Sequence, residues 1–155
     1  MLLETIRSPL NLILLLFIIS STAIGQESYL CTRVIDGDTI VVDMSGKEER
    51  VRLIGVDTPE TVHPEKPVEY FGKEASEFTK NMVEGKELRL EYDWQKRDKY
   101  GRLLAYVYLM DGTFLNAEII KQGYGFAYTK FPFKYLEEFR KYEREARESG
   151  RGLWE

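Results

Sequence analysis

Hydrophobic and polar positions alternate in short stretches along the first part of the chain. Stretches rich in Val, Ile and Leu predict strands over 29–36, 39–44 and 48–56, since such residues favour extended, half-buried backbone. Asp36-Gly37 and Ser45-Gly46 separate them and are typical of tight turns. We therefore expect three successive strands here.

The pattern then changes to a helical one. Residues 57–70 contain three prolines and predict an irregular loop. The apolar positions that follow recur at helical spacing and predict a helix ending at Gly85. These positions are Phe71, Ala75, Phe78 and Met82.

Two strands and two helices complete the pattern. Alternation over 88–94 predicts a half-buried strand, and a further strand over 102–109 turns at Asp111-Gly112. Asn116 is suited to cap a short helix that stops at Gly123. Apolar residues near helical spacing mark a last helix that ends by Gly150. They are Leu136, Phe139 and Ala146.

This order of elements predicts an α+β fold, a five-stranded OB-fold β-barrel with three α-helices. Five short strands with a helix after the third suit a closed, strongly twisted barrel. Other α+β folds share the order. The length of 155 residues fits one domain.

The amino terminus has a different character. Leu12–Ile19 is an unbroken apolar run that follows Arg7, and small residues including Ala23 and Gly25 come after it. This is the layout of a secretory signal peptide. We expect residues 1–25 to be the signal and 26–155 the mature domain, which places the protein outside the cell or in the cell envelope. The alternative is a membrane anchor formed by residues 10–24 that is not cleaved.

Charge and cysteine content restrict the chemistry. The net charge is −4, and removal of residues 1–25 leaves it at −4, so any binding of a polyanion must use a local cationic cluster. Cys31 is the only cysteine, so no internal disulfide can form. Because it lies in an apolar, strand-like stretch, it is expected to be a buried thiol. One Cys and one His cannot make a zinc site.

Acidic residues cluster at two turns. Asp36 and Asp38 lie in a DGDT turn, and Asp57 and Glu60 lie in a DTPE segment where the third strand ends. In a meander of three strands these two points can share one end of the sheet. Each motif alone is common in ordinary turns. Together they predict that Asp38, Asp57 and Glu60 meet, with Asp36 nearby.

Such a cluster requires a positive charge, because several ionised carboxylates in a small space repel one another. A hard divalent cation suits oxygen ligands, and Ca²⁺ accepts irregular ligation better than Mg²⁺ does. We therefore expect one Ca²⁺ ion. From the residues alone, Glu60 could serve as a ligand, directly or through water, or as a general base.

Two arginines complete the candidate chemistry. Arg52 precedes Asp57 by five residues, and Arg102 ends a DKYGR segment that begins at Asp98. A guanidinium group matches two phosphate oxygens and stays charged at any working pH. Phosphoryl transfer relies on positioning and charge neutralisation, which one cation and two arginines can supply. Singly, each arginine could instead form a surface salt bridge.

Aromatic residues offer flat faces for bases. Those considered are Tyr100, Tyr124, Tyr128 and Phe131. The alternative for each is packing in the core. His63, the only histidine, is expected to be an exposed loop residue, since the chemistry already has a base.

The sequence resembles the staphylococcal nuclease (thermonuclease) family. The resemblance rests on VIDGDTIVV at 34–42, RLIGVDTPE at 52–60, FGKEASEFTKNMV at 71–83 and DKYGRLLAYVY at 98–108, and it extends over residues 30–154. It implies the OB barrel and Ca²⁺-dependent cleavage of DNA and RNA, without preference for the sugar, to 3′-phosphorylated products.

The resemblance also implies a role for each site residue. Asp38 and Asp57 would bind Ca²⁺ through side chains and Thr58 through its carbonyl, with Asp36 in the outer shell. Glu60 would be the general base. Arg52 and Arg102 would hold the phosphate in the transition state. Three residues would contact the substrate, namely Lys99, Tyr100 and Tyr128.

Two functions remain open at this stage. The first is a nuclease whose partners are DNA and RNA, preferably single-stranded, acting as a monomer without an obligate protein partner. The second is a catalytically silent OB module that binds single strands or a protein. The combination of Asp38, Arg52, Asp57, Glu60 and Arg102 favours the enzyme, because a binding module has no need of all five.

Overall fold

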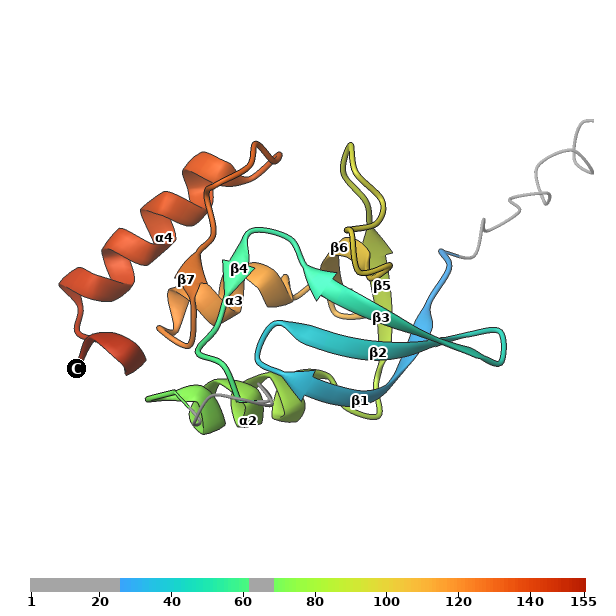
Figure 1. Cartoon of the computed structure of the whole chain (residues 1–155). Helices are drawn as coiled ribbons and strands as arrows, with labels where there is room; N and C mark the ends of the chain where they lie inside the picture. Colours follow the sequence, from blue (N-terminus) through green and yellow to red (C-terminus); the bar gives the residue numbers. More distant parts are fainter. Residues whose placement is uncertain (1–25, 62–68) are drawn as a thin grey trace, which may run out of the picture.

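The computed structural model describes residues 26–61 and 69–155. A closed five-stranded barrel forms its centre, with strand order β1-β2-β3-β6-β5 (Figure 1). The strands of the barrel are β1 (Tyr29–Asp36), β2 (Thr39–Met44), β3 (Lys47–Leu53), β5 (Glu87–Glu91) and β6 (Leu103–Leu109). The pairing of β3 with β6 is parallel and the other four pairings are antiparallel.

Within the described residues, three α-helices accompany the barrel. Helix α2 (Gly72–Val83) lies along β1, and α3 (Leu115–Lys121) packs between β6 and α4 (Leu136–Glu148) (Figure 1). A short 3₁₀ helix, Gly152–Trp154, follows α4. The prediction of a five-stranded OB-type barrel with three α-helices is therefore confirmed.

The barrel interior is filled by apolar side chains from alternating strand positions. Ile40, Val42 and Val51 are completely buried, as is Cys31, which is a free thiol. Burial raises the pKa of the Cys31 thiol to about 11, so the thiol stays neutral. The expected buried thiol is confirmed.

The strand predicted over 48–56 is in fact two strands. β3 ends at Leu53, and a separate β4 (Val56–Asp57) pairs with β7 (Phe126–Ala127). The backbone turns at Gly55, whose φ is +73° and whose position would put a Cβ atom 2.6 Å from the Phe133 ring. Glycine is needed there because any side chain would be both strained and obstructed.

Two further predictions were wrong in their details. Strand β5 stops at Glu91, so Trp94 lies in the β5–β6 loop and not on a strand. Asn116 does not cap α3, since Phe114 holds that position. The Asn116 side chain is buried and bonds to the barrel, where it accepts from Val107 N at 2.9 Å.

The signal segment predicted over residues 1–25, its alternative as an anchor over 10–24, and His63 lie outside the described residues. In the described part of the chain, no helix combines the length and the apolar character needed to cross a bilayer.

Replacement of Asn116 tests the buried bonds that join α3 to the barrel. The Asn116 amide also donates to Ile54 O at 3.0 Å and to Ala105 O at 3.2 Å. We expect Asn116→Ala to lower the free energy of unfolding by about 2–4 kcal/mol, because buried polar groups lose partners. Denaturant unfolding measures this change.

Asn81→Ala is the matched control, since Asn81 is exposed on α2. Its effect should stay within about 0.5 kcal/mol. A loss below about 1 kcal/mol for Asn116→Ala would contradict the proposed role of these bonds.

Candidate active site

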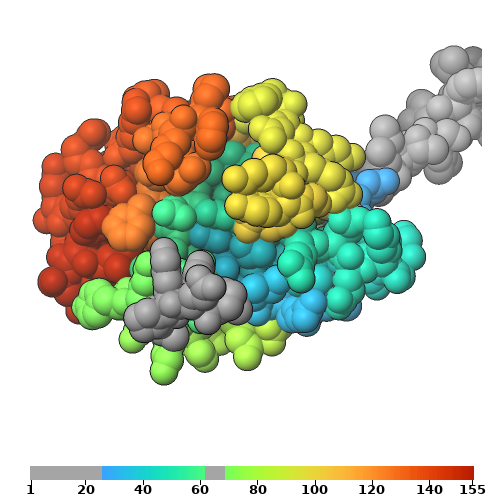
Figure 2. Space-filling view, viewed as in Figure 1, coloured from blue at the N-terminus to red at the C-terminus, as the bar shows by residue number. Residues whose placement is uncertain are grey.

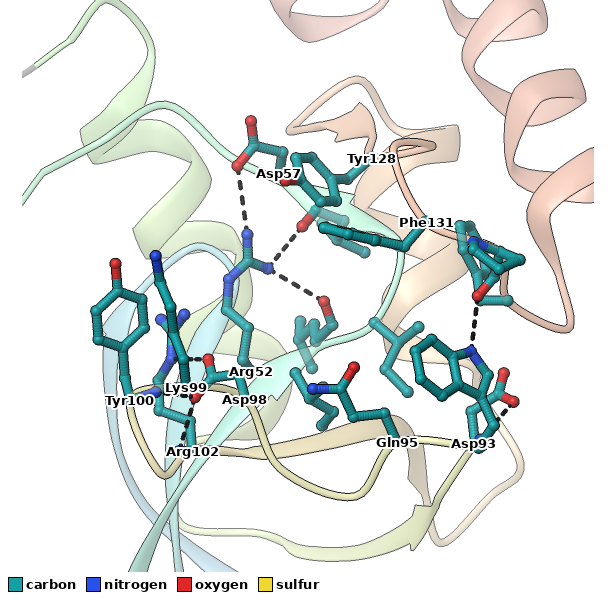
Figure 3. Close-up of a pocket in the computed structure, with 18 residues that line it drawn as sticks. Arg52, Asp57, Asp93, Gln95, Asp98, Lys99, Tyr100, Arg102, Tyr128 and Phe131 are labelled. Carbon is teal, nitrogen blue, oxygen red and sulfur yellow. Dashed lines mark hydrogen bonds and ion pairs between the residues drawn. The ribbon is translucent and has the colours of Figure 1, made fainter.

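A groove of about 600 Å³ lies beside the barrel. Its floor is the segment from Arg52 to Asp57, and its walls are the β5–β6 loop and the β7–α4 loop. Figure 2 shows these loops, in yellow and orange, rising on two sides of the teal and green β3–β4 surface. Many of the predicted site residues line this groove (Figure 3). They are Arg52, Asp57, Lys99, Tyr100, Arg102 and Tyr128.

Arg52 is the most constrained of these side chains. Its Nη2 pairs with Asp38 Oδ2 at 3.1 Å and with Asp57 Oδ1 at 3.3 Å. Its Nη1 donates to Leu53 O at 3.1 Å and to Val56 O at 2.6 Å. One guanidinium group thus joins the β1–β2 turn, the end of β3 and β4, and it brings Asp38 and Asp57 together.

Asp38 lies beneath the groove in the tight β1–β2 turn, and its side chain is only 8% exposed. Its Oδ2 accepts from Thr58 N at 2.9 Å. Gly37 has no room for a side chain, since a Cβ atom would lie 2.7 Å from Thr58 Oγ1. Thr79 Oγ1 on α2 donates to Gly37 O at 2.7 Å. The turn is therefore fixed to β4 and to α2, which sets the direction of the Asp38 carboxylate.

Arg52 does not fully neutralise the carboxylates of Asp36, Asp38 and Asp57. Burial and the neighbouring Asp38 charge raise the pKa of Asp36 from 3.8 to about 7. The same two causes raise the pKa of Asp57, although its side chain is 52% exposed. Arg52 lowers both pKa values but does not offset these causes. A bound cation would relieve this repulsion.

Glu60 lies on the segment that follows β4. Within residues 26–61 and 69–155, no three acidic, His or Cys side chains form a cluster that could hold a metal. Glu60 N donates to Glu69 Oε2 at 3.0 Å, and Glu69 N donates to Glu60 O at 2.9 Å. These bonds fix the backbone at Glu60.

Three of the predicted residues line a smaller hollow of about 300 Å³. Asp36, Glu60 and Arg102 line it, together with Thr39 and Arg50. Arg102 also lines the main groove, so the two spaces adjoin at this side chain. Glu60 and Arg102 therefore border one space next to the groove.

The DKYGR segment is organised by Asp98. Its Oδ1 accepts from the backbone N of Tyr100 at 2.9 Å and of Arg102 at 3.0 Å. Its Oδ2 forms an ion pair with Arg102 Nε at 2.7 Å. Lys99 Nζ lies 5.0 Å from the centroid of the Tyr100 ring. One carboxylate thus sets the positions of two cations and an aromatic ring.

Tyr128 reaches the groove through the β4–β7 pairing. Phe126 pairs with Asp57, and Tyr128 N donates to Gly55 O at 2.9 Å. Lys130 Nζ lies 5.5 Å from the centroid of the Tyr128 ring. Tyr124, by contrast, stacks on Phe78 with ring centroids 4.2 Å apart and packs against the core.

Comparison with known proteins identifies the family. Residues 50–155 match the family described as staphylococcal nuclease homologue. The chain is 50% identical over 137 residues to a thermonuclease of Staphylococcus intermedius, covering 88% of this chain and 81% of the relative. It belongs to the staphylococcal nuclease family. It is accordingly a nuclease that acts on phosphodiester bonds, as the resemblance implied.

Two further relatives agree. A thermonuclease of Staphylococcus hyicus is 46% identical over 131 residues, with 84% of this chain and 77% of the relative covered. The endonuclease YncB of Bacillus subtilis (strain 168) is 45% identical over 125 residues, with 79% of this chain and 59% of the relative covered. Nucleic acids are thus the substrates expected of this staphylococcal nuclease homologue.

Some groove residues of this nuclease were missed by sequence reasoning. Trp94 was assigned to a strand because it continues the alternation of Tyr92 and Asp93. Asp98 was considered only as the first residue of the DKYGR motif, because in a loop a spacing of four residues does not predict its ion pair with Arg102. Arg50, which lines the smaller hollow, gave no signal, since an alternating polar position is ordinarily solvated.

The Asp36 carboxylate offers a test of the charge balance in the metal-free nuclease. Its folded pKa of about 7 exceeds its ordinary 3.8, so the folded state binds more protons between these values. Asp36 therefore lowers stability increasingly as the pH rises from about 4 to about 7. We expect Asp36→Asn, measured in chelator, to raise Tm clearly at pH 8 and hardly at pH 4.

Asp111→Asn is the matched control. Asp111 accepts from Thr113 N at 2.9 Å in an exposed turn, and this hydrogen bond lowers the pKa of Asp111. Its replacement should not raise Tm at pH 8. Equal gains for Asp36→Asn at both pH values would contradict the charge argument.

Proposed function

We propose that this nuclease is an exported, Ca²⁺-dependent enzyme that cleaves DNA and RNA without preference for the sugar, favours single strands, and releases 3′-phosphorylated products. The observation that carries the proposal is the Arg52 guanidinium group, which joins Asp38 and Asp57 at the floor of the groove. Export rests on the apolar segment within residues 1–25. The alternative is the same enzyme anchored through residues 10–24.

The donor set fits one calcium ion. Asp38 and Asp57 would hold it through carboxylate oxygens and Thr58 through its carbonyl, while Asp36 would act from the outer shell. Ca²⁺ accepts carboxylate, carbonyl and water oxygens in irregular geometry, which suits the Asp38 and Asp57 carboxylates together with the Thr58 carbonyl. When bound, the ion would neutralise the carboxylates and part of the charge that develops on the phosphoryl oxygens.

The two arginines would grip the phosphate. Arg52 is held by two carbonyl oxygens through Nη1, which fixes its orientation before substrate arrives. Arg102 is held by Asp98, and its side chain is 27% exposed. Guanidinium groups fixed in advance are most effective where charge increases in the transition state. Lys99, Tyr100 and Tyr128 would bind the neighbouring parts of the substrate.

Glu60 would take the proton from the attacking water. It borders the hollow that it shares with Arg102, so a water bound there would lie between a carboxylate and a phosphate-binding cation. Its place on this hollow, and not among the residues that line the groove with Asp57, favours a base over a direct ligand. The same position remains compatible with contact to the ion through water.

The calcium requirement has a direct test. Purified residues 26–155 are incubated with denatured DNA, in Ca²⁺ or in chelator. We expect fragmentation in Ca²⁺ only, with phosphate at the 3′ ends of the fragments, because the carboxylates need the ion to accept an anionic substrate. Equal fragmentation in both samples contradicts the metal role. No fragmentation in either favours the binding module.

The role of Glu60 is tested by Glu60→Gln, which keeps shape and removes the basic group. We expect kcat to fall by about 10²- to 10⁴-fold, the usual effect of losing a general base. Initial rates on single-stranded DNA in saturating Ca²⁺ measure this. Glu77→Gln, at an exposed position of α2, is the matched control and should retain full activity. A parallel loss of Ca²⁺ affinity would instead favour Glu60 as a ligand.

A further inference from the structure

Exposed aromatic side chains gather at the groove. Among the described residues, three of the six exposed large apolar side chains line it. Trp94 is 66% exposed, Tyr100 71% and Phe131 61%. Exposed apolar surface concentrated in a groove marks a binding site more than scattered single residues do. The family resemblance accounts for Tyr100 but assigns nothing to Trp94 or Phe131.

Trp94 is held in place without being buried. Its Nε1 donates to Pro132 O at 2.9 Å, which joins the β5–β6 loop to the β7–α4 loop (Figure 3). Its backbone N donates to Asp93 Oδ1 at 2.7 Å. Asp93 Oδ2 in turn accepts from Lys134 N at 2.9 Å. The indole ring is thus fixed at its polar edge, while its face stays open to the groove.

Phe131 extends this surface from the other loop. It directly precedes Pro132, the acceptor of the Trp94 bond, so the two side chains come from loops that this bond joins, and both line the groove. The Tyr128 ring lies next to it, with centroids 6.2 Å apart and ring planes inclined by 45°. The aromatic rings of Tyr128, Phe131 and Trp94 therefore all line the groove.

The charges beside these rings indicate the kind of ligand. Arg52, Lys99 and Arg102 line the same groove, and Lys130 lies beside the Tyr128 ring. The chain as a whole carries a net charge of −4, so this group of cations is a local feature. A ligand that suits both parts is a polyanion with flat apolar groups. Unpaired nucleotides have this chemistry, whereas the bases of a duplex are hidden in its stack.

We propose that Trp94 and Phe131 form a stacking subsite for an unpaired base, one that extends the groove beyond the nucleotide held at the arginines. This proposal depends on the proposed function in one respect only: it assumes that a substrate phosphate binds at Arg52. Because every base has a flat face, it gives affinity for single strands without sequence preference. The Trp94–Pro132 bond lowers the entropy lost on binding, since the ring is already ordered.

The test compares a long ligand with a short one. Binding of oligothymidylate of roughly eight nucleotides and of a thymidine dinucleotide is measured in Ca²⁺ with Glu60→Gln, so that cleavage does not interfere. We expect Trp94→Ala and Phe131→Ala each to raise the Kd of the longer ligand by about 5- to 100-fold. The Kd of the dinucleotide and that of a duplex should change less than about twofold.

Conservative variants separate stacking from loop structure. Trp94→Phe and Phe131→Tyr keep a flat ring and should retain most of the affinity. The longer ligand should quench the fluorescence of Trp94, and this quenching should vanish in Trp94→Phe, where only Trp154 remains. Met110→Ala is the control, since Met110 is 59% exposed and is not among the residues that line the groove. It should leave both Kd values unchanged.

Each outcome has a distinct meaning. Equal losses for both ligand lengths, or losses in the conservative variants with lowered Tm, show that the rings support the loops and overturn the subsite. Unchanged affinity in both alanine variants overturns it as well. The proposed function is judged separately by Ca²⁺-dependent cleavage in the parent protein. A chain that binds through Trp94 but never cleaves would retain the subsite and lose the nuclease mechanism.

Discussion

The ion pairs of Arg52 with Asp38 and Asp57 are the contacts on which the rest of the site depends. One guanidinium group meets two carboxylates and two backbone carbonyls, and these belong to three separate segments. Removing it would leave a largely buried Asp38 without its cation, which is far more unfavourable than the loss of a surface pair. The same geometry leaves the carboxylates poised for a further positive charge.

The barrel explains why these segments meet. The parallel pairing of β3 with β6 sets Arg52 beside Leu104. The DKYGR loop, which precedes β6, therefore lies next to the carboxylates that Arg52 contacts. The small β4–β7 sheet brings Tyr128 to the same place. Neither pairing is local in sequence. The groove is therefore a product of barrel closure, with the loops supplying chemistry on a rigid scaffold.

An acidic protein can bind an acidic polymer here because the cations and aromatic rings are concentrated in one groove. Arginines fixed by carbonyl or carboxylate partners provide charge at the floor and at one wall, and Trp94 and Phe131 provide flat apolar surface in the same groove. At a net charge of −4, the protein as a whole repels a polyanion at long range. Recognition must then rely on short-range contacts in the groove.

The sequence by itself determined β1 and β2 to the residue and the burial of Cys31, and it predicted which acidic and arginine side chains form the site, because alternation, turn residues and motifs are local. Only the tertiary structure decided the break after Leu53, the buried role of Asn116 and the exposure of Trp94. In each case a contact distant in sequence overrides a local preference: rings against Gly55, carbonyls of the barrel that accept from Asn116, and the Pro132 carbonyl that accepts from Trp94. Local patterns do not encode such contacts, since they depend on which surfaces barrel closure brings together.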